Sequence, residues 1–187
     1  MPYRDIPFEE VVMLQKIPYF LSVLGMIGGV FISILFGVDE SLFKERINAG
    51  LENNSKIQAI QDVEIKKETI KSESEKNWRY YQRYHFHANA VSGLSLALLI
   101  FLAFVQAKKS EKFIAGYLIS VGGFLYPFVW LFAALYGPQM GRTEAKEAFA
   151  IFGYMGGVFF LGVIYALFLA AVKPLKEPLA YGEPSFA

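Results

Sequence analysis

The chain contains two histidines, His85 and His87, and both lie where a charged, aromatic-rich segment meets an uncharged one. Arg79 and Arg83 precede them, and the residues from Ala88 to Ala107 carry no charge. An imidazole at the edge of hydrocarbon has to be hydrogen-bonded, hydrated or bound to a metal, because burying an unpaired polar group costs free energy. Ionisable groups at such depths in a membrane usually mark a functional site. The histidine pair is therefore the first candidate for chemistry.

Helix geometry separates the two histidines. Each residue turns an α-helix by about 100°, so residues two apart point about 200° away from each other. His85 and His87 therefore cannot bind one metal ion while the segment is helical. His85 shares its face with Asn89 and Ser92, whereas the face of His87 carries small and aliphatic residues that suit a flat apolar macrocycle. We expect His87 to be an axial metal ligand. For His85 three roles stay open: support of that ligand, a ligand shared with another subunit, or a hydrogen-bonded residue of the membrane interface.

Four uncharged runs are long enough to cross a bilayer, which needs about 20 mostly apolar residues. They are Pro18–Val38, Ala88–Ala107, Phe113–Gly137 and Ala148–Val172. The hydrophobic content of 55% is too high for an ordinary soluble domain, and these runs account for it. The sequence predicts an all-α, polytopic protein of the lipid bilayer: one four-transmembrane-helix bundle over residues 1–187. With an even number of spans, both termini lie on one side.

Composition excludes several classes of protein. The absence of cysteine excludes disulfides, iron–sulfur clusters, thiolate metal sites and covalent c-type haem. A net charge of +1 argues against nucleic acid as a partner. The first apolar run exceeds the typical length of a signal-peptide core, about 7–15 residues, and no A-x-A cleavage site follows it. We therefore expect it to be retained as the first span.

Basic residues set the expected orientation. The short connection Lys108–Lys112 contains three lysines, and Lys173 and Lys176 follow the last run. Short loops rich in lysine and arginine favour the cytoplasm, whereas long loops cross the membrane largely regardless of charge. We expect a multi-pass protein of the cell membrane with both termini in the cytoplasm and residues 39–87 outside.

The segment from Asp39 to His87 is the one long polar region, and it lacks proline. Gly50 and the polar residues after it indicate a turn. We expect a long helical hairpin outside the membrane. Its apolar stripe consists of Leu42, Phe43, Ile47, Leu51, Ile57, Ile60, Ile65 and Ile70. This stripe is too thin to form a core alone, so we expect it to pack against itself or against another copy, in a homo-oligomer. Residues 5–17 are expected to form an interfacial helix, with Pro18 breaking the direction before the first span.

The predicted topology brings the histidines to the same membrane side as the connection between the third and fourth spans. That connection supplies Met140, a potential thioether ligand, and Arg142. Haem b needs an apolar slot between helices, axial ligands from His or Met, and cations for its propionates. The candidate haem-binding residues are His87, His85, Met140, Arg83, Arg79 and Arg142. A copper site formed by His85, His87 and Met140 is the alternative.

A short resemblance supports haem. The stretch His87-Ala88-Asn89-Ala90-Val91-Ser92-Gly93 resembles the helix that binds the low-spin haem in the catalytic subunit of cbb3-type haem–copper oxidases and their nitric oxide reductase relatives. It is also similar to small membrane proteins related to that superfamily. The oxidases have more spans, and more histidines for a second haem and copper, which this chain lacks. The resemblance therefore implies a role with a single haem and no reduction of oxygen or nitric oxide.

These observations favour a membrane electron carrier over a stand-alone enzyme. We expect b-type haem that exchanges electrons between quinol, or another redox partner, and a partner protein. A structural or assembly subunit of a membrane complex is the competing class. A transporter is disfavoured, because the second to fourth spans hold no acidic or basic residue to couple ions.

Overall fold

The computed structural model describes residues 8–176, with side chains from residue 16 on, and this part of the chain is almost entirely helical. Its elements are α1 (Phe8–Val38), α2 (Glu40–Glu52), α3 (Ser55–Gln58), α4 (Val63–Phe104), α5 (Lys109–Leu125), α6 (Phe128–Met140), α7 (Arg142–Ala148) and α8 (Ala150–Val172). One isolated antiparallel bridge joins Val105 to Leu175. The predicted all-α class is confirmed.

Within residues 8–176, four helical stretches are long and apolar enough to cross a membrane, as the sequence predicts. They are Lys16–Val38, Val63–Phe104, Lys109–Met140 and Ala150–Val172. The third combines α5 and α6, which are separated at Tyr126 and Pro127. With 42 residues, α4 is about 63 Å long, roughly twice the thickness of a bilayer core. One continuous helix thus carries both the polar segment and the apolar segment, and the histidines lie between them.

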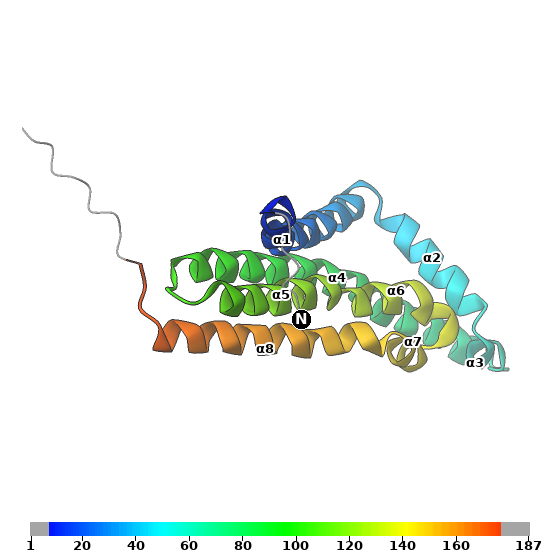
Figure 1. Ribbon diagram of the computed structural model, residues 1–187. Helices are drawn as coiled ribbons and strands as arrows, with labels where there is room; N and C mark the ends of the chain where they lie inside the picture. The colour runs from blue at the N-terminus through cyan, green and yellow to red at the C-terminus, as the bar shows by residue number, and fades with distance from the viewer. Residues whose placement is uncertain (1–7, 177–187) are drawn as a thin grey trace, which may run out of the picture.

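The spanning helices pack side by side (Figure 1). In this arrangement α8 lies along α5, and α1 and α6 both lie along α4. From the end of α1, α2 leads away to α3, and α4 then runs back along the bundle (Figure 1). Side-chain caps define these corners. Asp39 accepts a hydrogen bond from the Ser41 N–H, Asn54 from that of Lys56, and Asp62 from the amides that open α4.

The apolar stripe of the polar segment packs against α6 of the same chain. A core cluster joins α2, α3, α4 and α6 through Ile47, Leu51, Ile57, Tyr80, Tyr81, Ala133 and Ala134. Asn54 extends this contact by donating from Nδ2 to the backbone carbonyl of Pro138 at 3.0 Å. Leu42 and Ile65, which belong to the same stripe, stay exposed. Most of the stripe is thus covered within one chain, without a second copy.

Pro18 does not end the first helix. The described part of the expected interfacial helix continues through it as α1, while residues 5–7 lie outside the described residues. Pro18 is buried, and the Ser22 hydroxyl donates to its carbonyl at 3.0 Å. A Cβ added at Gly116 of α5 would lie 3.8 Å from Pro18 Cγ. Contact between helices therefore keeps the proline inside α1, although it removes one backbone hydrogen bond.

Glycines allow α1 and α4 to approach each other closely. A Cβ at Gly25 would lie 2.1 Å from Ser92 Oγ, and one at Gly29 would lie 2.8 Å from Asn89 Cγ. Small residues four apart on a helix allow this kind of close approach between membrane helices. In α8 the close contacts are at Gly156 and Gly162, where an added Cβ would lie 2.9 Å from Tyr126 Cδ2 and 2.7 Å from the backbone nitrogen of Ile119.

Candidate functional site

His85 faces α1. Its Nδ1 lies 2.9 Å from the backbone carbonyl oxygen of Gly29 and 3.1 Å from Nδ2 of Asn89. A carbonyl oxygen can only accept, so the contact with Gly29 requires the ring proton on Nδ1. In that tautomer Nδ1 cannot accept from Asn89 Nδ2, which donates instead to the His85 carbonyl at 3.1 Å. The other nitrogen, Nε2, makes no hydrogen bond within the part of the chain whose side chains are described. The ring of His85 is therefore fixed through one nitrogen, and the other is left as an acceptor or a ligand.

His87 faces the junction of α5 and α6. Its ring stacks on Trp130 with centroids 5.8 Å apart and an angle of 14°, and it meets the Tyr126 ring at 5.2 Å and 75°. Among residues 16–176, neither of its nitrogens has a hydrogen-bond partner. The two imidazoles thus contact different helices, as predicted by the angle of about 200° between residues two apart on a helix.

Arg83 and Trp130 lie beside His87. The guanidinium carbon of Arg83 is 4.9 Å from the Trp130 ring centroid and 5.6 Å from that of Tyr80. Cation–π contacts of this kind are favourable where water is scarce. The indole N–H of Trp130 is buried and has no hydrogen-bond partner among the residues whose side chains are described. This face of α4 and α6 therefore presents a cation next to an imidazole, and the unpaired indole donor is buried beneath the surface.

The other predicted residues lie elsewhere. Arg142 is paired with Glu73, with Nε 2.7 Å from Oε2, and this hydrogen bond raises the pKa of the Arg142 guanidinium above its usual value. Arg79 is exposed on α4, and Met140 is exposed at the end of α6. In the described part of the chain, no group of three or more His, Cys, Asp or Glu side chains is placed to hold a metal ion.

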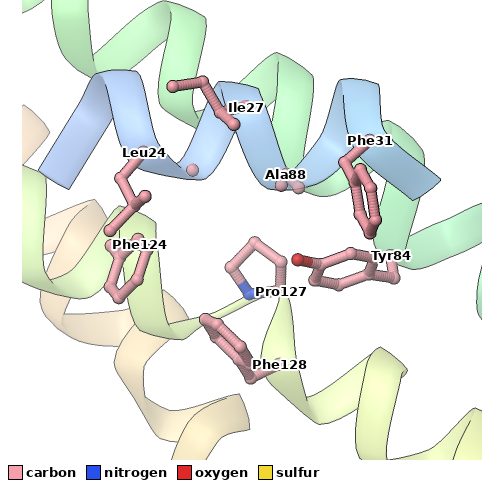
Figure 2. A pocket seen from close by; sticks show the side chains of 10 residues that line it. Leu24, Ile27, Phe31, Tyr84, Ala88, Phe124, Pro127 and Phe128 are labelled. Carbon is pink, nitrogen blue, oxygen red and sulfur yellow. The ribbon is translucent and has the colours of Figure 1, made fainter. Parts of the chain in front are cut away.

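A cavity of about 330 Å³ lies between α1, α4 and the α5–α6 junction. Its lining residues are Leu24, Gly25, Ile27, Gly28, Phe31, Tyr84, Ala88, Phe124, Pro127 and Phe128. Figure 2 shows the hydroxyl of Tyr84 pointing toward Pro127. The sequence analysis missed this site. The sequence feature that could have indicated this cavity is Pro127 within an uncharged run, because a proline inside a helix removes a backbone hydrogen bond and disturbs the helix.

These positions test the fit of haem b to the chain. His85 and His87 face different helices, and neither lines the cavity. One chain therefore does not enclose a macrocycle between two imidazoles. Each histidine keeps a nitrogen without a partner in the described part of the chain, and the exposed Arg83 is available to a carboxylate. The residues present fit one axial bond per chain, and a second axial ligand has to come from another copy or another protein.

Comparison with known proteins found no matching protein-family model, no matching curated protein and no matching solved structure.

Proposed function

We propose that this chain is a multi-pass membrane protein that binds b-type haem and carries electrons between a quinol and a partner. The hydrogen bond from His85 Nδ1–H to the Gly29 carbonyl is the observation that carries the proposal. Metal-ligating histidines commonly donate one ring N–H to a backbone carbonyl, which fixes the tautomer and leaves the second nitrogen for the metal. A bound haem b supplies one-electron exchange at its iron.

The axial bond is best assigned to His85. Its ring is fixed by α1, whereas His87 is held by ring stacking alone. His87 is the competing ligand and was the first choice from sequence. Arg83 supplies a cation for propionates, with Arg79 as a further cation. Arg142 is already paired with Glu73, which argues against a share in haem binding.

The source of the second axial ligand determines which oligomer we propose. Because the two imidazoles of one chain point to different helices, we propose a homo-oligomer in which two copies contribute one ligand each. The copper alternative would need His85, His87 and Met140 at one point. The contacts of His85 with α1 and of His87 with α6 argue against that site.

The membrane placement is part of the proposal. We place α2, α3 and the polar first half of α4 outside the bilayer as a helical protrusion, with both termini in the cytoplasm. Support comes from the length of α4, about twice that of a bilayer core, and from the lysines at the opposite end of the bundle.

Absorption spectroscopy tests the function. The full chain, produced in cells that make haem and purified in detergent, is expected to show a Soret band and an alpha band that sharpens on reduction. Phe86→Leu is a matched control, since Phe86 lies between the histidines and is 66% exposed. Its spectrum is expected to equal that of the parent chain. A preparation without Soret absorbance overturns the proposal and leaves a structural or assembly subunit as the function.

A further inference from the structure

The cavity lies between α1, α4 and the break between α5 and α6. Helix α5 ends at Leu125 and α6 begins at Phe128, with Pro127 between them. On the opposite side, Gly28 of α1 leaves room for the side chain of Tyr84, because a Cβ at Gly28 would lie 2.9 Å from the Tyr84 hydroxyl oxygen. Its volume of about 330 Å³ lies at the lower end of the range of small-molecule sites, about 300–1,000 Å³.

The chemistry of the walls limits the ligand. The hydroxyl of Tyr84 is the one polar side-chain group among the lining residues, and it makes no hydrogen bond within the described part of the chain. It points into the cavity, and the rings of Phe124 and Phe128 stand nearby (Figure 2). A phenol that is nearly buried gains free energy when it finds an acceptor. The ligand is therefore uncharged, carries a hydrogen-bond acceptor and presents a flat face to aromatic rings.

The entrance to the cavity lies on an apolar surface. Leu24, Ile27 and Phe31 of α1 line the cavity and are 51%, 57% and 58% exposed. In a protein that crosses a membrane with α1, this surface faces hydrocarbon, so the ligand arrives dissolved in the bilayer. An acyl tail alone would fill the apolar walls but would leave the Tyr84 hydroxyl without an acceptor.

We infer that this cavity binds the ring of a membrane quinone, with one ring carbonyl accepting a hydrogen bond from Tyr84. The site deepens the proposed electron-transfer function and rests on it for its biological meaning. The link is Tyr84, the proposed quinone donor, which directly precedes His85, the proposed axial ligand, in α4. Binding itself requires only the cavity.

Equilibrium dialysis of decylubiquinone against the purified full chain tests the site. Saturable binding of about one molecule per chain is expected. Tyr84→Phe keeps the ring and removes the donor, and it is expected to weaken binding about tenfold. Tyr154→Phe is the control, because Tyr154 is 71% exposed on α8 and does not line the cavity. It is expected to bind as the parent chain does.

Two results overturn the inference. One is equal binding by Tyr84→Phe and Tyr154→Phe in variants whose helical circular dichroism matches the parent chain. The other is displacement of decylubiquinone by decanol at equal concentrations, which would make the cavity a site for acyl tails. Dialysis measures the quinone directly, so a preparation without a Soret band tests the cavity as well as one with it. Failure of haem binding and failure of quinone binding are therefore separate results.

Discussion

The Nδ1 atom of His85 lies 2.9 Å from the backbone carbonyl oxygen of Gly29, which joins the ring on α4 to the backbone of α1. The glycine also makes that approach possible, because a Cβ at this position would lie 2.8 Å from Asn89 Cγ. Asn89 in turn donates to the carbonyl of His85 at 3.1 Å. Close contact between two helices and the orientation of one imidazole therefore depend on the same three residues.

Substitution of Gly29 tests this dependence. Gly29→Ala is expected to push α1 away from α4, because its Cβ would meet all three terminal heavy atoms of the Asn89 amide group. Overpacking of this kind typically costs about 1–3 kcal/mol. Thermal unfolding in detergent measures the loss, and the haem content per chain is expected to fall with it. Gly37→Ala on the same helix is the control, since a Cβ there has no neighbour within 4 Å. Equal stability of the two variants would contradict this reading.

The ion pair of Glu73 and Arg142 gives a second prediction, which concerns stability. Removal of the guanidinium leaves the Glu73 carboxylate, whose side chain is 25% exposed, with Lys76 as its remaining cation. Arg142→Ala is expected to lower the free energy of unfolding by about 1 kcal/mol. The Glu73→Gln background is expected to reduce that loss in a double-mutant cycle.

The exposed pair of Lys56 and Glu144 is the comparison for this prediction. Its side chains are 73% and 43% exposed, so Lys56→Ala is expected to leave stability unchanged within error. Unfolding curves of the two alanine variants, recorded in the same detergent, measure the contrast. A larger loss for Lys56→Ala than for Arg142→Ala would count against the ranking by burial.

A third prediction concerns membrane placement. The chain has no cysteine, so a single introduced cysteine reports one position. Gln61 lies between α3 and α4, Lys109 begins α5, and both are exposed. An impermeant maleimide is expected to label Gln61→Cys from outside intact cells, and Lys109→Cys only after the membrane is opened. Labelling of both from one side would overturn the proposed topology.

Part of this structure follows from the sequence because the relevant signals are local. An uncharged run of sufficient length defines a span wherever it packs, and all four runs appear as helices long enough to cross a membrane. The separation of His85 from His87 follows from helix geometry alone. The apolar stripe of the polar segment likewise contains side chains that are fully buried, Ile47 and Leu51, although Leu42 and Ile65 stay exposed.

Other features depend on residues far apart in the chain. The apolar stripe packs against Ala133 and Ala134 on α6. In the sequence, nothing distinguishes these two alanines from the other small residues of the same uncharged run as contacts for the stripe. The cavity at Tyr84 requires the register of α1 against α4, which places Gly28 opposite the hydroxyl. Periodicity within one helix contains no information on that register. The role of Gly29 as acceptor for His85 was missed for the same reason.

The last prediction assigns the axial ligands of the proposed haem. His85→Ala is expected to abolish the Soret band, because it removes the imidazole whose ring is fixed by α1. His87→Ala is expected to retain haem with a changed reduction potential, since residues next to a ligand tune a metal site more gently than loss of the ligand. Met140→Leu is expected to leave the low-spin spectrum unchanged. Loss of haem in His87→Ala alone would return the axial bond to the residue expected from the sequence.

Equal loss in both histidine variants would indicate one iron held by two copies, and mixed oligomers then identify the pair. Chains carrying His85→Ala and chains carrying His87→Ala, produced together with different affinity tags, are purified through both tags. If His85 of one copy and His87 of the other bind one iron, a mixed dimer retains one complete ligand pair and regains half of the parent haem content. If both axial bonds come from the same position in each copy, the mixed dimer holds a single such imidazole and stays colourless. The Soret absorbance per dimer therefore distinguishes the two arrangements.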